Sequence, residues 1–388
     1  MEANIASDNF INFHNFSIIT NNMKKVIFSL IFSLAAANMS AQGLVPLISS
    51  SSSQTDVEPF VPGTTVEGVA YFLPRTAFRV TIIAEKTTIK PGDFHKYADR
   101  YLRMQDVPTE ERVEWSLKSI TLEPYGKPDP NKAFSIKLKG KTVAPLVGLS
   151  RDGIILSINC DATESFLPDL PKPEKGSAPE NPRSYMTQEI IAAGSTAKMA
   201  ELCAQEIYDI RDSKNSLVRG EADNTPKDGA QLKLMLDQLD KQAAALESLF
   251  SGTSQTDTEV FSLFYDPQEE TERDVLFRFS KKLGVLDADN LAGEPILASV
   301  KALETIPAMV PSEETAKKQA KLTSGVFYNV PVRTKVKVTY GDKEFVNMET
   351  PMAQFGTVEI LSNTLFDKKT TTQVTFFQET GGTKDIME

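Results

Sequence analysis

Histidine, the side chain that most often serves as a catalytic base, is nearly absent from this sequence. The chain holds two histidines, and only His95 lies beyond the segment that we expect to be removed on export. Serine and cysteine nucleophiles need such a base beside them. His95 follows Asp93 at the start of an expected short helix and lies off its apolar side, which favours an exposed surface histidine.

The two cysteines have different surroundings. Cys203 falls on the apolar side of an expected helix, where cysteine usually serves as a small buried hydrophobe. Cys160 ends a strand-like run. In an oxidising compartment the two could also form a disulfide across the proline-rich segment between them, and spacing alone leaves both alternatives open.

Metal and cofactor sites have no signature in the chain. Two cysteines and two histidines exclude a zinc ribbon, an iron–sulfur cluster and a multi-histidine site. No P-loop, dinucleotide-binding glycine pattern, G-x-S-x-G or H-E-x-x-H sequence occurs. Residues 287–290 are similar to the start of a calcium loop, but Leu291 stands where a ligand is required, so we interpret them as a turn. We predict no metal and no cofactor.

Carboxylates are the remaining route to catalysis, since glycosidases work with two of them. The chain has 52 acidic side chains, and this abundance singles out no pair. One charged group near the end of an expected helix is more typical of a solvated or salt-bridged surface. It comprises Glu206, Asp209, Arg211, Asp212, Arg219 and Glu221. We therefore predict no catalytic residue.

Aromatic residues provide the candidates for ligand contact. Tyr71 and Phe72 precede one proline of the chain, and Phe327 and Tyr328 precede another. We expect packing at the start of a strand as their first role and ligand contact as their second. Trp115, the only tryptophan, alternates with apolar residues and is expected in a core.

Those aromatics belong to two similar segments. Residues 68–82 and 325–340 share Gly-Val-x-Tyr, an apolar residue followed by proline, and an alternating basic strand. The match is either chance convergence of two strands or a duplicated β unit, and one short match leaves both open.

The pattern of apolar residues predicts an α+β fold in which two mostly antiparallel β-rich units flank a long αα-hairpin. Alternation at Phe78, Val80 and Ile82 predicts a half-buried strand. Helical spacing over 199–210 and 232–250 predicts two helices joined by a short loop. Thr225 is expected to cap the second helix and Gly252 to end it.

An export signal precedes the folded part. Lysines at 24 and 25, an apolar run over 26–37 and small residues after it are typical of a secretory signal peptide, with cleavage expected after Ala41. The run is too short to span a membrane, and no later segment is long and apolar enough. We expect a periplasmic or secreted protein.

The predicted boundaries follow from these features. They are 1–22, an upstream over-extension; 23–41, the signal peptide; 42–57, a serine-rich leader; 58–165, an N-terminal α+β domain; 166–183, a proline-rich linker; 184–252, the helical hairpin; and 253–388, a C-terminal β-rich domain. The net charge of −10 argues against nucleic-acid binding, which depends on neutralising phosphates.

Several segments carry a resemblance to a known family. They are GVAYFLPRT, KPGDFHKYADRYL, EIYDIRDSKNSLVRGEAD, LMLDQLDKQ, LFRFS and MAQFG. With them the chain resembles the secreted proteins of Bacteroidales that are catalogued only as a domain of unknown function. The resemblance covers nearly the whole mature chain and implies an envelope or secreted protein. It offers no activity and no functional residues.

Together these features favour a non-enzymatic binding or scaffold protein, whose partner would be an envelope protein, a glycan or a peptide. The alternative is a carboxylate-dependent hydrolase that acts on a glycan or a peptide. Two close carboxyl groups with raised pKa in one pocket would favour the hydrolase. An open sheet edge or an apolar surface would favour the binding protein.

Overall fold

The computed structural model describes residues 55–63, 68–138, 147–223, 226, 228–304, 325–362 and 372–387. The predicted signal peptide and most of the leader lie outside these residues. The described chain is rich in β-strands with fewer helices, and its strands form three antiparallel sheets. The expectation of an α+β fold with antiparallel sheets is thereby confirmed.

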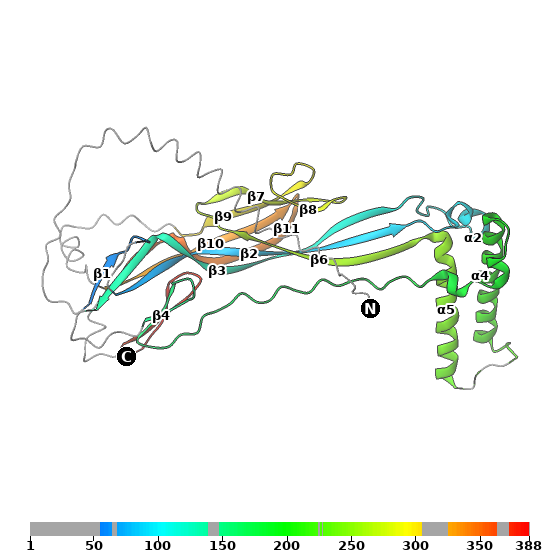
Figure 1. Cartoon of the computed structure of the whole chain (residues 1–388), viewed down its shortest axis with the longest axis horizontal. Coiled ribbons are helices and arrows are strands. Elements are labelled where there is room, and N and C mark those ends of the chain that lie inside the picture. The colour runs from blue at the N-terminus through cyan, green and yellow to red at the C-terminus, as the bar shows by residue number, and fades with distance from the viewer. Residues whose placement is uncertain are drawn as a thin grey trace, which may run out of the picture. The chain divides into compact units, whose positions relative to one another are not determined.

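The first sheet contains the longest strands. In spatial order it consists of β1 (Thr55–Pro59), β3 (Arg112–Leu138), β2 (Val69–Lys90) and β6 (Thr253–Tyr265). Figure 1 shows β2, β3 and β6 running side by side. The apolar residues that alternate along β2 point into the core, as predicted, and Phe78, Val80 and Ile82 are fully buried.

A five-stranded sheet packs against it. Its strands are, in spatial order, β11 (Lys343–Ser362), β10 (Gly325–Tyr340), β9 (Glu294–Ala302), β7 (Thr271–Ser280) and β8 (Gly284–Leu286). Buried residues of this sheet, such as Phe277, Ile296 and Val336, join those of β2 in one hydrophobic cluster. The two sheets thus form a sandwich with alternating inward residues.

A third, smaller sheet consists of β13 (Thr383–Met387), β12 (Gln373–Phe376), β5 (Ile155–Ile158) and β4 (Val147–Leu149). Its buried residues pack on Tyr71 and Leu73 of β2 and on Val326 of β10. The cluster therefore ties the start of β2 to the start of β10.

The strands before and after the helices share sheets. β6 pairs with β2, and β12 pairs with β5. The boundaries expected at residues 165 and 253 therefore do not separate one sheet from another. Strands pair through main-chain groups that all residues share, so the residue pattern of a single strand does not predict its partner. The pairing of strands across the predicted boundaries could therefore not be predicted from the sequence.

The helices form their own hydrophobic cluster. They are the 3₁₀ turns η1 (His95–Tyr97) and η2 (Pro182–Tyr185) and the helices α2 (Ala98–Leu102), α3 (Gln188–Ile191), α4 (Thr196–Arg219) and α5 (Gly229–Ser251). Figure 1 shows α4 and α5 side by side, and Cys203, Ile207 and Leu246 are buried between these helices and their neighbours.

Two predicted helix starts differ from the structure. α5 begins at Gly229, and Asp228 is its N-cap, with the carboxylate accepting a hydrogen bond from the Ala230 N–H. Thr225, the expected cap, lies outside the described residues. Asp93 does not cap the first helical turn, which begins after Phe94 without a side-chain cap. Gly252 ends α5, as predicted.

The proline-rich segment 166–183 is held against the first sheet. The Arg79 guanidinium donates to the carbonyl of Pro168, and Glu174 exchanges two main-chain hydrogen bonds with Thr258 of β6. The contacts explain why Arg79, on the side of β2 expected to face solvent, is only 8% exposed. The segment serves as a strap across the sheet and not as a free linker.

The two similar segments form equivalent hairpins, β2–β3 and β10–β11. In the first, Leu73 stands opposite residues 129–132; in the second, Pro331 stands opposite residues 353–356. An irregularity of the same size therefore falls in both copies, one residue later in the second copy than in the first. Because bulges are specific features of a hairpin, this match favours a duplicated β unit over chance convergence.

Candidate functional site

Two of the four candidate aromatics, Tyr71 and Phe327, lie in the core. Tyr71 is fully buried, and its hydroxyl accepts a hydrogen bond of 3.0 Å from the Phe327 N–H. Burial raises the pKa of Tyr71. Phe327 stacks on Phe134 with ring centroids 4.3 Å apart. Both residues pack the start of a strand, the first role expected for them.

The other two candidates differ from each other. Phe72 donates its N–H to the Gly153 carbonyl, and its ring lies beside that glycine. Tyr328 is half-buried and lines a recess. Of the four aromatics, Tyr328 is therefore the one that the structure places in a candidate binding site.

The two cysteines are not brought together. Cys203 is buried in the helical cluster, where desolvation raises the pKa of its thiol to about 12. Cys160 lies at the end of β5, and its thiol contacts the Val374 carbonyl. Both are free. Because Cys203 is buried in the helical cluster and Cys160 lies against β12 of the third sheet, the structure does not support the disulfide alternative.

The remaining sequence candidates have structural roles. The Nδ1 atom of His95 lies 2.8 Å from the Gly92 carbonyl, which makes this half-buried histidine part of a turn. Arg211 pairs with Glu247 across α4 and α5. Trp115 packs against the core of the sandwich, as predicted.

An apolar recess of about 600 Å³ lies where β10, β11 and the turn between β12 and β13 meet. This volume falls within the usual range for ligand sites, about 300–1,000 Å³. Apolar side chains form much of its wall: Pro124, Tyr328, Val330, Pro331, Pro351 and Phe377. A few polar groups converge on it: Asn329, Thr350, Glu379, Thr380 and Thr383. Apolar walls with few polar groups are typical of binding sites.

Hydrogen bonds from neighbouring elements and within the turn itself fix the turn that carries Phe377 and Glu379. The Thr76 hydroxyl donates to the Glu379 carbonyl, and the Asn329 side chain donates to the Thr380 carbonyl. The Phe377 carbonyl accepts from the Gly381 N–H, which closes the turn. Bonds of this kind hold the exposed Phe377 ring in place before any ligand arrives, which reduces the entropy cost of binding.

Asn329 carries an unused acceptor at this recess. The residue is fully buried, and its amide nitrogen donates to the carbonyls of Pro74 and Thr380, which fixes the amide orientation. Its Oδ1 atom is buried and has no hydrogen-bond partner. An unpaired buried acceptor costs about 1–3 kcal/mol. Because the Oδ1 atom has almost no accessible surface, a ligand would recover that cost only after a shift of the surrounding side chains.

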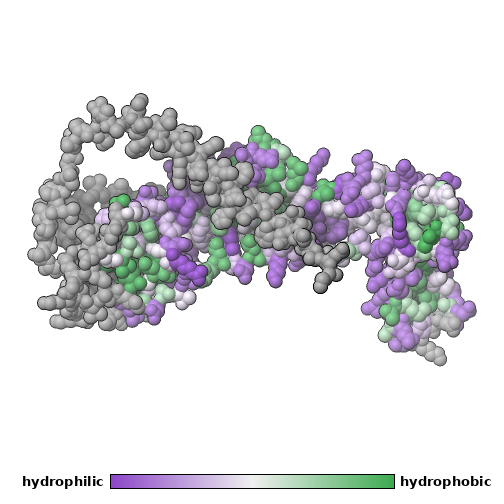
Figure 2. Space-filling view, in the orientation of Figure 1, coloured by the Kyte–Doolittle hydropathy of each residue, from purple (hydrophilic) through white to green (hydrophobic). Residues whose placement is uncertain are grey.

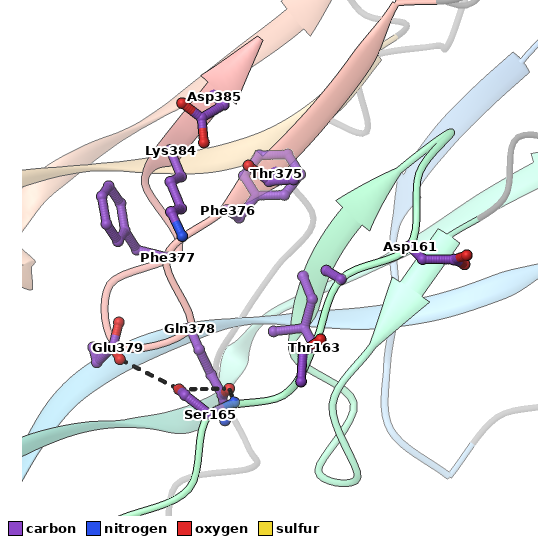
Figure 3. Close-up of a pocket in the computed structure, with 12 residues that line it drawn as sticks. Asp161, Thr163, Ser165, Thr375, Phe376, Phe377, Gln378, Glu379, Lys384 and Asp385 are labelled. Carbon is purple, nitrogen blue, oxygen red and sulfur yellow. Dashed lines mark hydrogen bonds between the residues drawn. The ribbon is translucent and has the colours of Figure 1, made fainter. Parts of the chain in front are cut away.

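A second recess of about 540 Å³ lies on the other side of the same turn and is more polar. Figure 3 shows Ser165 bonded to Gln378 and Glu379 at its base, with distances of 3.0 and 3.4 Å from the hydroxyl. Lys384 points into it. Phe377 and Glu379 line both recesses, so the two recesses lie on either side of the turn that carries these residues.

The carboxylates of the polar recess do not converge. Asp161 and Asp385 lie on opposite sides of the view in Figure 3 and point apart, while Glu379 lies near Ser165. A glycosidase-type pair requires two carboxyl groups that face one reacting bond, about 5–10 Å apart. The arrangement is therefore better suited to hydrogen bonding and charge than to paired acid–base catalysis.

Where carboxyl pKa values are displaced, they are displaced downward. Burial would raise the pKa of Asp266, but hydrogen bonds from Arg75 and Lys127 outweigh it and lower that pKa. Hydrogen bonds from Lys118 and Asn347 lower the pKa values of Glu85 and Glu344. A general acid needs the opposite displacement, so these three residues act as ion-pair and hydrogen-bond partners.

The part of the chain that the structure describes contains no cluster of three or more potential metal ligands. Its helices include none with the length and hydropathy that a membrane crossing requires.

The sequence singled out only Tyr328 among the residues of this site. Phe377, Gln378 and Glu379 carry no motif, and the one local signal is the Gly381-Gly382 pair, which is typical of a turn. The residues that meet at the apolar recess come from β3, β10, β11 and the last turn of the chain. Their proximity arises from the sheet pairing and has no counterpart in spacing along the chain.

Comparison with known proteins gives one match. A family model described as "Domain of unknown function (DUF4831)" matches residues 67–384. No curated protein and no solved structure matches the chain. The matched range contains both recesses except for Asp385, and the family assigns no role to any of their residues.

Proposed function

We propose that this chain, which belongs to the DUF4831 family of unknown function, is a non-enzymatic binding protein of the cell envelope. The observation that carries the proposal is the apolar recess with its unused buried acceptor, Asn329 Oδ1. The recess has the size and the composition of a ligand site. Its polar neighbour supplies charged groups that can orient a ligand.

The ligand contacts the exposed Phe377 ring in this proposal. Phe377 is 46% exposed although it is a large hydrophobic residue, and it lines both recesses. An exposed aromatic ring held on an anchored turn buries a large apolar area on binding at little entropy cost. The same turn places the Glu379 side chain beside it.

The test compares wild-type protein with Phe377→Ala in binding to a panel of peptides and oligosaccharides. Wild type should bind at least one compound, and the variant should bind it at least tenfold more weakly. Phe264→Ala is the matched control, because Phe264 is 64% exposed on β6 and lines neither recess. Equal affinities of wild type and Phe377→Ala for every bound compound would contradict the proposed site.

The location in the envelope rests on the sequence over residues 23–41. Fractionation of the source cells followed by N-terminal sequencing tests it. We expect a periplasmic or secreted chain that begins at Gln42. Recovery of an uncleaved cytoplasmic chain would overturn this part of the proposal.

A carboxylate-dependent hydrolase is the second candidate, because Asp161, Glu379 and Asp385 all line the polar recess. It predicts turnover of a glycan or peptide in the same panel, lost in Glu379→Gln. Binding by the wild-type protein without turnover of any compound in the panel supports the non-enzymatic function.

A further inference from the structure

β13 offers an unpaired sheet edge at the candidate site. It pairs with β12 on one side, and no other described strand pairs with its other side. The residues from Lys384 to Met387 are exposed. The N–H and C=O groups of such an edge are a template on which a further strand can be added.

The edge strands β6 and β11 of the two larger sheets are protected. β6 forms main-chain hydrogen bonds with Glu174 of the proline-rich strap. β11 carries Pro351 and the charged residues Lys343, Glu344 and Glu349. Prolines and charges are common protections of an exposed edge. β13 also carries two charged residues, Lys384 and Asp385, but it has no proline, and its last two residues are apolar and exposed: Ile386 is 53% and Met387 50% exposed.

The edge begins beside the two recesses. Thr383, the first residue of β13, lines the apolar recess, and the next two, Lys384 and Asp385, line the polar one. Figure 2 shows hydrophobic residues gathered over β4 and the strands beside it, in the sheet to which β13 belongs. Successive side chains of a strand point to opposite faces, so a strand added here would present neighbouring side chains to two different surroundings.

The chemistry of the two recesses defines the added strand. A peptide provides a hydrogen-bond donor at nearly every residue, which the polar groups that line the two recesses can accept. The polar recess contains three carboxylates, Asp161, Glu379 and Asp385, against the single ammonium of Lys384. A basic side chain would complement this excess of negative charge.

We propose that the ligand is an extended peptide that adds to the free edge of β13 and alternates apolar with basic side chains. The apolar side chains enter the recess beside Phe377, and the basic ones face Glu379 and Asp385. This inference rests on the proposed binding function and specifies its ligand.

The experiment measures fluorescence anisotropy of two labelled octapeptides with the mature protein. One alternates valine and lysine, and the other alternates valine and glutamate. We expect the lysine peptide to bind at least tenfold more tightly. The same lysine peptide with alternate amides N-methylated should lose at least tenfold in affinity, because it cannot complete the main-chain hydrogen bonds of an added strand.

Two variants locate the binding. Asp385→Lys should abolish the preference for the lysine peptide, and Phe377→Ala should weaken its binding at least tenfold. Asp289→Lys, in an exposed turn after β8, is the matched control for charge and should change neither. Circular dichroism and a thermal melt of each variant show that it is folded.

The outcomes separate this inference from the function on which it rests. Equal binding of both peptides, no binding of either, or binding that Asp385→Lys and Phe377→Ala leave unchanged would overturn the peptide ligand. If an oligosaccharide still binds in a manner that depends on Phe377, the binding function stands and only its ligand class changes.

Discussion

The hairpins β2–β3 and β10–β11 share a motif and a bulge, but their surroundings differ. In the first, the fully buried Tyr71 is bonded to Phe327, and Phe72 contacts Gly153. In the second, Tyr328 and Asn329, which occupy the corresponding positions, line the apolar recess. One copy of the motif is thus closed by the rest of the chain, and the other leaves a cavity.

A main-chain contact is common to both copies. The residue two positions before the motif's proline donates its N–H to a glycine carbonyl, from Phe72 to Gly153 and from Asn329 to Gly381. Phe72 places an aromatic ring against its glycine, whereas Asn329 places an amide whose acceptor has no partner. The two copies therefore share a main-chain contact but differ in the side chain at that position, and four measurements test this difference.

The largest effect is expected at the two glycines. Both have positive φ, +69° at Gly381 and +79° at Gly153, and an added Cβ at Gly381 would lie 2.7 Å from the Pro74 ring. Gly381→Ala should cost about 3 kcal/mol of unfolding free energy and Gly153→Ala about 2 kcal/mol. Gly341→Ala, with φ +54° and open space around it, should cost about 1 kcal/mol.

Urea denaturation measures all three glycine variants. If both copies depend on the shared contact, Gly381→Ala and Gly153→Ala both lose more unfolding free energy than Gly341→Ala. Equal losses of unfolding free energy in the three variants would show that the contact does not stabilise either copy.

The first arginine after the proline of each copy comes next, Arg75 directly after Pro74 and Arg333 two residues after Pro331. Arg75 donates three hydrogen bonds to Asp266 and is 17% exposed, whereas Arg333 is 61% exposed and pairs loosely with Glu304 and Glu349. Arg75→Ala should cost about 2–3 kcal/mol, because it leaves a partly buried carboxylate without its main partner. Arg333→Ala should cost less than about 0.5 kcal/mol. Similar losses in urea denaturation would show that the copies do not differ here.

The tyrosines give a smaller difference. Tyr71→Phe leaves the Phe327 N–H without its partner and should cost about 1–2 kcal/mol. Tyr328→Phe should change the free energy of unfolding by less than about 0.5 kcal/mol, because Tyr328 is half-buried at the open recess. Thermal denaturation of the two variants side by side checks the prediction, and a larger loss in Tyr328→Phe would contradict it.

The smallest effect is a pH dependence at the ion pair between Arg75 of the first copy and Asp266. Because the folded-state pKa of Asp266 is lowered, its stabilisation is present above the unfolded value of about 3.9 and is lost as the pH falls through the folded value. Wild type should therefore lose stability more steeply below about pH 4 than Asp266→Asn. Parallel pH profiles of unfolding for the two proteins would contradict this role of Asp266.

Much of the local structure could be predicted from the sequence. Alternation identified β2 and β10, helical spacing identified α4 and α5, and Gly252 marked the end of α5. The start of α5 was misplaced, because Asp228 caps the helix where the threonine–proline pattern pointed to Thr225. Caps and short periodic runs are local signals, and local signals are what a single sequence contains.

The candidate site was much less accessible to prediction. Tyr328 was found because the motif is repeated, but Asn329 and Phe377 gave no signal. Asn329 lies in a strand, and alternation along a strand predicts only which face of the sheet a residue occupies. What distinguishes Asn329 is its Oδ1 acceptor, which the packing around it leaves without a hydrogen-bond partner. No pattern within β10 encodes the position of the turn that follows β12.

The sequence by itself determined which segments are strands and helices, the scarcity of histidine and cysteine chemistry, and the repeated motif. These depend on interactions within a few residues of one another. The tertiary structure alone decided that β6 pairs with β2 and β12 with β5, and that a recess opens beside the second copy. Hydrogen bonds between strands are made by main-chain groups common to all residues, so only the packing of the whole chain selects the partners.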